Sequence, residues 1–166
     1  MEETILAWIE NYGASALYFV PILAFAEACV GLGLFVSGAF LLGLATLLYS
    51  NGVASVELIS VLAMLGATLG DHAGFYVGYF FGPQFNGSRF ALKHQEKLGK
   101  AEELVRRYGG FAIFVGRFIP AIRSIIPAVL GVSGFRRKTY SVLDLCACLV
   151  WSAALAGLVM GIEMVL

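Results

Sequence analysis

Long apolar blocks alternate with short polar links along this chain. The apolar blocks run over about 16–49, 53–82, 111–134 and 140–166. A helix needs about 20 apolar residues to cross a bilayer, and blocks two and four each have the length of one span. The first block is longer than one span needs, and the third is interrupted by prolines. Residues 53–82 and 140–166 are therefore predicted to be transmembrane helices.

Two further segments are predicted to lie at the membrane surface. In residues 1–15 the apolar side chains recur at helical spacing and the acidic ones fall elsewhere. This pattern predicts an amphipathic interfacial helix, and the acidic start disfavours a cleavable signal. The polar segment 84–109 holds a cluster of Lys and Arg residues. By the positive-inside rule, it is predicted to be a cytoplasmic amphipathic segment.

The third block, 111–134, lies between two basic clusters. A second cluster, Arg136-Arg137-Lys138, follows it, and the positive-inside rule places that cluster in the cytoplasm too. The block then enters and leaves by one face, which predicts a re-entrant hairpin with breaks at Pro120 and Pro127. The alternative is one kinked span, which would place one basic cluster outside.

The first block, 16–49, is predicted to be a second hairpin, entered from the outer face. Its length, its central Glu27 and the glycines Gly31 and Gly33 favour a broken helix. The predicted fold is an all-α polytopic membrane protein with two inverted repeats. Each repeat is a re-entrant hairpin plus a transmembrane helix, with the amphipathic cytoplasmic helix between them. Inverted repeats with broken helices are the architecture of many secondary transporters.

Glycine recurs at every fourth position along the second block. A smooth groove on one side of a helix lets another backbone approach closely. We expect this groove to receive a hairpin of the same chain, with a homodimer interface as the alternative use. The predicted groove residues are Gly66, Gly70, Gly74, Gly78 and Gly82.

Composition agrees with a membrane protein. Hydrophobic residues make up 60% of the chain and charged residues 13%, against about 45–50% and about 25% in soluble domains. The formal net charge is zero, so the charge balance indicates no nucleic-acid partner. The three cysteines lie in apolar stretches, where ordinary buried thiols are expected. We expect no metal or other cofactor.

Several ionisable residues lie deep in the apolar blocks. Glu27, Asp71, Arg117 and Arg123 are the main ones, and each is costly near the bilayer centre unless it is paired. If the two hairpin tips meet, Glu27 faces Arg117 or Arg123, and Asp71 pairs with one of them. Purely structural ion pairing is one interpretation. The other is an anion site, because arginine binds phosphate or carboxylate through two parallel hydrogen bonds.

Two further residues, His72 and Asp144, are secondary candidates among the deep polar groups. His72 follows Asp71 directly, and a packed polar pair is the expectation for these two neighbours. A general base is the alternative role for His72.

The segments GATLGDHAGFYVGYFFG and YGGFAIFVGRFIPAIRSIIPAVLGVSGF resemble the DedA family of membrane proteins, also called the SNARE-associated or VTT domain. The resemblance covers almost the whole chain, so residues 1–166 are expected to form one DedA-like domain. The arginine–proline segment is the most specific part. The matching residues are Glu27, Gly70, Asp71, Gly78, Gly82, Arg117, Phe118, Pro120, Arg123, Pro127 and Gly131.

The resemblance implies two facing re-entrant hairpins and movement of lipids across the membrane. Family substrates include undecaprenyl phosphate and phosphatidylethanolamine. Proton coupling is proposed for the family through the early glutamate, a second acid and the two arginines. Here Ser37 stands near the place of the second acid, and Tyr79 replaces the usual arginine of a Gly-Arg pair. Asp71 is the candidate to substitute for that acid.

The sequence thus predicts a multi-pass inner-membrane lipid transporter, not an enzyme. Its partners would be a polyprenyl phosphate or a phospholipid, and protons. Arg117 and Arg123 would bind the lipid phosphate, and Glu27 and Asp71 would serve proton coupling or ion pairing. The alternatives are a proton-coupled small-ion transporter, an intramembrane lipid phosphatase and a scaffold without transport. The phosphatase has little support, because the sequence has no histidine or serine set with catalytic spacing and His72 and His94 are isolated residues.

The predicted topology is testable by cysteine labelling. With the native cysteines replaced, single cysteines placed at Gly110 and at Lys138 should both react only with a reagent added to the cytoplasmic side. Labelling of either position from outside would restore the single kinked span.

Overall fold

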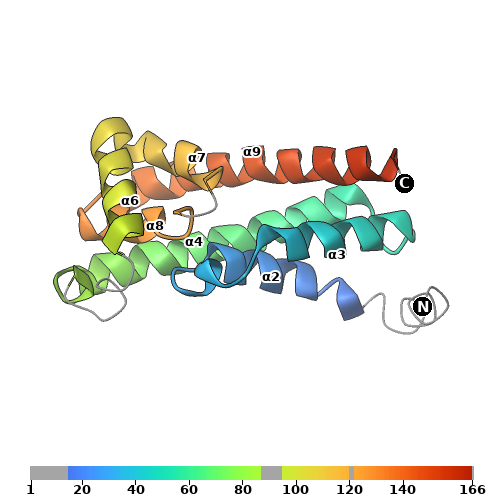
Figure 1. Cartoon of the computed structure of the whole chain (residues 1–166), viewed down its shortest axis with the longest axis horizontal. Coiled ribbons are helices and arrows are strands. Elements are labelled where there is room, and N and C mark those ends of the chain that lie inside the picture. Colours follow the sequence, from blue (N-terminus) through green and yellow to red (C-terminus); the bar gives the residue numbers. More distant parts are fainter. Residues whose placement is uncertain (1–14, 87–94, 120–121, 166) are drawn as a thin grey trace.

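Two long helices, α4 (Val56–Asn86) and α9 (Arg137–Glu163), run antiparallel along the molecule (Figure 1). The structure is a computed structural model that describes residues 15–86, 95–119 and 122–165, all helices and turns. Val56–Gly82 and Arg137–Glu163 are long and apolar enough to cross a membrane. The predictions of an all-helical fold and of two long apolar spans are confirmed.

The first apolar block forms a helical hairpin. Helix α2 (Phe19–Ala28) is followed by the short 3-10 helix η1 (Leu32–Leu34) and by α3 (Gly38–Ser50). The turn begins at Gly31, whose φ of 90° favours glycine over any side-chain-bearing residue. Ser37 caps α3, because its hydroxyl accepts a hydrogen bond from the Ala39 amide at 3.3 Å.

Beyond α4, the described residues form shorter elements that lie at the other end of the long helices (Figure 1). These elements are α6 (Gln95–Tyr108), η2 (Gly109–Phe111), α7 (Ala112–Arg117) and α8 (Ile126–Val132). Between α7 and α8, residues 118–119 and 122–125 are not helical.

Several boundaries differ from the sequence predictions. The predicted break at Pro127 lies in the first turn of α8, where proline is tolerated because the amide has no helical partner. Pro120 and nearly all of the predicted interfacial helix 1–15 lie outside the described residues. Helix α9 begins inside the basic link, at Arg137, and α4 continues to Asn86, four residues past the predicted end.

The buried apolar side chains form two separate cores. The first joins α2, α3 and the N-terminal half of α4 to the C-terminal half of α9, with Ala24, Leu41 and Val159 among its members. The second joins the rest of α4 and α9 to α6, α7 and α8, with Phe75 and Tyr140 at its centre. The Phe75 and Tyr140 rings stack 4.0 Å apart. The deep charged residues lie between these two cores.

The glycines of α4 let both hairpins approach its backbone. A Cβ atom at Gly66 would lie 2.2 Å from the Pro21 carbonyl oxygen, and one at Gly70 would lie 2.6 Å from that of Phe25. Further along the helix, a Cβ at Gly78 would lie 2.0 Å from a carbonyl oxygen of α8. Contacts this short exclude any side chain. The groove therefore seats α2 at one end and α8 at the other.

The other two glycines of the groove, Gly74 and Gly82, make looser contacts. At Gly74 a Cβ would meet Pro127 and Val30 at ordinary van der Waals distance, and at Gly82 it would meet Val132. Within the described residues, all five glycines predicted as a packing groove thus face α2, α8 or the turn after α2.

An alanine at Gly78 should destabilise the protein, because the α8 backbone would have to move. We expect a loss of about 1–3 kcal/mol, as for other overpacked sites, seen as a lower midpoint of thermal unfolding in detergent. Gly157 is the matched control, since nothing lies within 4 Å of a Cβ there. Gly157→Ala should be neutral or stabilising by about 1 kcal/mol. Equal effects of the two substitutions would contradict the close packing.

Candidate functional site

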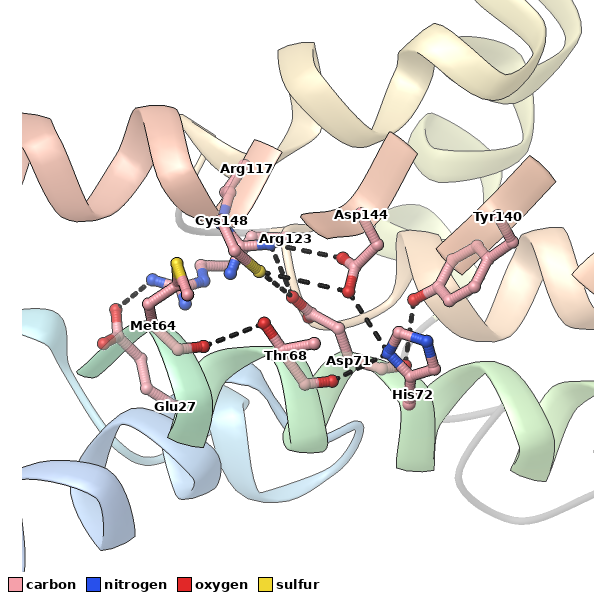
Figure 2. Close-up of polar contacts among 10 residues, drawn as sticks. All are labelled: Glu27, Met64, Thr68, Asp71, His72, Arg117, Arg123, Tyr140, Asp144 and Cys148. Atoms are coloured by element: carbon pink, nitrogen blue, oxygen red, sulfur yellow. Dashed lines mark hydrogen bonds and ion pairs between the residues drawn. The ribbon is translucent and has the colours of Figure 1, made fainter. Parts of the chain in front are cut away.

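Four buried charged side chains meet between the two cores (Figure 2). Glu27 comes from the last turn of α2, Asp71 from the middle of α4, Arg117 from the end of α7, and Arg123 from the stretch before α8. Arg123 Nη1 donates to Glu27 Oε1, and Arg117 Nη1 donates to Asp71 Oδ2 at 2.5 Å. The structure thus brings together all four residues that the sequence singled out, in two pairs.

A third carboxylate, Asp144 on α9, extends this cluster. Its Oδ1 lies 3.5 Å from Arg117 Nη1, and its Oδ2 lies 3.2 Å from His72 Nδ1. His72 therefore pairs with Asp144. The predicted polar pair of His72 with its chain neighbour Asp71 is wrong. The reason is helical geometry, because adjacent side chains of a helix point in different directions.

His72 makes two further polar contacts. Its Nδ1 lies 2.9 Å from the Thr68 carbonyl oxygen, and its Nε2 lies 3.0 Å from the Ser141 hydroxyl. Since Thr68 O and Asp144 offer only acceptors to Nδ1, that nitrogen carries a proton. The arrangement holds the imidazole in place between α4 and α9.

Trp151 on α9 is a site residue that the sequence reasoning missed. Its ring faces both guanidinium groups, with the Cζ atoms of Arg117 and Arg123 at 5.5 Å and 5.2 Å from the ring centroid. At such distances the ring stabilises both cations. A sequence signal existed, because Asp144, Cys148 and Trp151 recur at helical spacing on one face of the last span.

The ion pairs leave buried donors and acceptors unused. Arg117 Nε and Nη2, Arg123 Nη2 and Glu27 Oε2 have no hydrogen-bond partner among the described residues. The space among Arg117, Arg123, Asp71 and Asp144 is about 10 Å³, room for about one water molecule. The guanidinium groups are thus enclosed by carboxylates yet keep unsatisfied hydrogen-bonding capacity.

A larger pocket adjoins the Glu27 end of the cluster. It has a volume of about 370 Å³ and lies between the start of α3 and the second half of α9. Glu27 lies at its inner end, beside Trp151, and its other walls are apolar. Phe118 and Leu158, both 56% exposed, stand at its rim. The pocket therefore connects the charged cluster with the apolar surface of the molecule.

The start of α3 lies against the Glu27 carboxylate. A Cβ at Gly38 would lie 2.5 Å from Glu27 Oε1, so glycine leaves the room that the carboxylate occupies. The neighbouring Ser37 serves as the cap of α3. Asp71 supplies a second deep carboxylate, but it pairs with Arg117 and not with Arg123.

Asp71, Asp144 and Cys148 place three possible metal-ligand atoms within 4.8 Å of one another. Arg117 already donates to Asp71 and approaches Asp144. A divalent cation there would face the guanidinium charge. We therefore assign these residues to the ion-pair network.

Comparison with known proteins identifies relatives of the chain. Residues 29–160 match the profile described as the VTT domain. An uncharacterized membrane protein of Buchnera aphidicola subsp. Baizongia pistaciae is 27% identical over 151 residues, covering 91% of this chain and 59% of that protein. Inner membrane protein YabI of Escherichia coli is 26% identical over 151 residues, with the same coverage of 91% and 59%.

A third relative is Protein DedA of Escherichia coli, 24% identical over 146 residues, which cover 86% of this chain and 67% of DedA. The chain spans less than two thirds of the length of the first two relatives. No solved structure matches the chain significantly.

The pairing of Glu27 with Arg123 can be tested by a double-mutant cycle. Arg123→Met and Glu27→Met should each cost about 3–5 kcal/mol, because each leaves a buried charge without its partner. The double variant should cost clearly less than the sum, measured by denaturant unfolding in detergent micelles. Strictly additive losses would show that the two side chains do not interact.

Proposed function

Because the chain belongs to the VTT-domain family, also called the DedA or SNARE-associated family, and is a membrane protein, we propose that it moves a phosphate-bearing lipid across the membrane. The membrane would be the bacterial inner membrane, as for YabI. The substrate would be a polyprenyl phosphate such as undecaprenyl phosphate, or a phospholipid.

One observation carries this proposal: buried guanidinium groups with unused donors lie beside an apolar pocket at the surface. Arg117 and Arg123 keep Nη2 groups without partners, and arginine binds phosphate oxygens through parallel N–H groups. The adjoining pocket is walled by apolar side chains and Glu27. A lipid with a phosphate head could bind the arginines through its phosphate and the apolar pocket through its tail.

The proposed architecture has two facing re-entrant hairpins, α2–η1–α3 and α7–α8. Their turns touch, because a Cβ at Gly33 would lie 2.8 Å from the Ser124 Cβ. Each hairpin carries one member of the Glu27–Arg123 pair. A rearrangement that separates the turns would expose the arginines to one side of the membrane or the other, as in alternating-access transporters.

The carboxylates would hold the arginines when no phosphate is bound. Glu27 and Asp71 occupy one donor of Arg123 and Arg117 respectively. Protonation of Glu27 would remove its charge, weaken the pair and free Arg123 for the phosphate. Phosphate binding and protonation would then favour each other, which is the basis of the proposed proton coupling.

The structure favours the lipid substrate over a small ion. A small-ion carrier calls for a closed, water-lined cavity, whereas the larger pocket at Glu27 is apolar with exposed side chains at its rim. A phosphatase would need a base free to act on a nucleophile. His72 instead contacts Thr68, Asp144 and Ser141.

Flipping of a fluorescent phosphate-bearing lipid in liposomes tests the proposal. Arg117→Ala and Arg123→Ala should each reduce the flipping rate by about tenfold or more, since a charge-assisted hydrogen bond contributes about 1.5–3 kcal/mol. Arg123→Lys should also be impaired if bidentate geometry matters, and active if charge alone suffices.

Arg106→Ala is the matched control, because Arg106 lies on the exposed side of α6, outside the cluster. Its rate should equal that of the wild type. Normal flipping by folded Arg117→Ala and Arg123→Ala proteins would refute the phosphate site.

A further inference from the structure

The pocket between α3 and α9 is larger and more apolar than the ion pairs alone require. It measures about 370 Å³, within the range of about 300–1,000 Å³ that small-molecule sites occupy. Its walls are formed by Leu41, Leu42, Trp151, Ala154, Leu155 and Leu158, with Gly38 and Glu27 at the inner end. The wall residues come from two helices far apart in sequence, so the packing of α3 against α9 creates the pocket.

The inner end of this pocket is polar and incompletely bonded. Glu27 is 6% exposed, and its Oε2 has no hydrogen-bond partner among the described residues. Arg123 lies directly behind Glu27 and has an unused Nη2 group. Trp151 connects the two environments, because its ring lines the pocket and faces the Arg123 guanidinium. The end of an apolar ligand in the pocket would therefore lie beside the Glu27 carboxylate, with the Arg123 guanidinium behind it.

The outer end of the pocket opens at the apolar surface. Ala39 and Ala154 are exposed lining residues, and Phe118 and Leu158 stand at the rim. The two helices that form the pocket, α3 and α9, carry further exposed apolar side chains on other faces, such as Phe40 and Leu149. In a membrane protein such a surface faces lipid chains, so a hydrocarbon tail could extend from the pocket into the bilayer without meeting water.

We propose that this pocket binds the head-proximal part of the hydrocarbon tail of a phosphate-headed lipid, with the phosphate taking the place of the Glu27 carboxylate on Arg123. The inference rests on the proposed function and adds where the tail lies and which side chains select it. A phosphate head would give Arg123 a new anionic partner once Glu27 moves away, whereas a neutral or cationic head would leave this arginine unpaired. Trp151 would contact both the tail and the guanidinium group.

Fluorescence of Trp151 tests this site without measuring transport. The chain has two tryptophans, so Trp8→Phe leaves Trp151 as the reporter. A brominated long-chain monoalkyl phosphate in liposomes should quench Trp151 more strongly than the brominated alcohol of the same chain. Arg123→Ala should abolish that difference. Equal quenching by the two amphiphiles in the parent protein would show a pocket filled by bulk hydrocarbon alone, and would overturn the proposal.

A matched pair of substitutions on α9 tests the tail position. Ala154 lines the pocket, whereas its exposed neighbour Ala153 is not among the lining residues. Ala154→Phe should fill the pocket, remove the excess quenching and weaken binding of the phosphate amphiphile by about tenfold, equivalent to about 1.4 kcal/mol. Ala153→Phe should leave both unchanged. Equal effects of the two variants would overturn the tail site.

The outcomes separate this inference from the transport function. If the arginine variants lose flipping but Ala154→Phe behaves as Ala153→Phe does, the phosphate site remains and the tail lies elsewhere. If excess quenching is present and depends on Ala154 and Arg123, yet flipping is normal in the arginine variants, the chain has a lipid site but the transport mechanism is wrong.

Discussion

Two guanidinium–carboxylate pairs, buried between two apolar cores, determine how the helices of this chain must meet. Arg117 and Arg123 stand on one hairpin, and their partners Glu27 and Asp71 stand on α2 and α4. An unpaired charge at this depth costs several kcal/mol. The main effect of the pairs is therefore to restrict the fold rather than to add stability. Any packing of the helices that separated the partners would leave unpaired charges buried.

Backbone packing makes these pairs possible. Both hairpins have to lie close to α4, and the glycines along α4 remove the side chains that would hold them off. Gly66 and Gly70 admit α2, and Gly78 admits α8, at distances that no Cβ could tolerate. With the hairpins seated this deeply, their turns touch each other and Glu27 reaches Arg123. The glycines of α4 and the buried charged residues, although far apart in the sequence, thus depend on the same packing of the two hairpins against α4.

The same arrangement links the charged cluster to the apolar surface of the molecule. The carboxylates saturate only part of each guanidinium group, and the pocket at Glu27 leads outward between α3 and α9. A site that held only a small ion would need no apolar extension. Trp151 contacts both arginines and lines the pocket, so it couples recognition of a head group to recognition of a tail in our account.

Much of this could be predicted from the sequence, and the limits have physical reasons. Charges inside apolar blocks are so costly that Glu27, Asp71 and the arginines stood out at once, and glycines at every fourth position indicated a packing surface. The choice of partners was left open, because it depends on the turn between α7 and α8.

Other features depend on tertiary context. Pro127 was predicted to be a break and lies in the first turn of α8, because proline is tolerated in a first turn and interrupts only the interior of a helix. His72 pairs with Asp144 on α9. Trp151 contacts the two arginines, but in the sequence it stands among the other apolar residues of its span. The first contact depends on the register of α4 against α9, and the second on how Arg117 and Arg123 lie against α9.

The central claim is that Arg117 and Arg123 exchange their carboxylate partners for a lipid phosphate. Solid-state NMR can observe that contact directly, through dipolar coupling between arginine ¹⁵N and lipid ³¹P. The bilayer should be made of glycolipid, so that the added polyprenyl phosphate is the only source of phosphorus. Our account predicts a ¹⁵N–³¹P coupling in the wild type that disappears in the Arg117→Lys/Arg123→Lys double variant. A coupling that is unchanged in the double variant, or absent in a wild type that still moves the lipid, would contradict it.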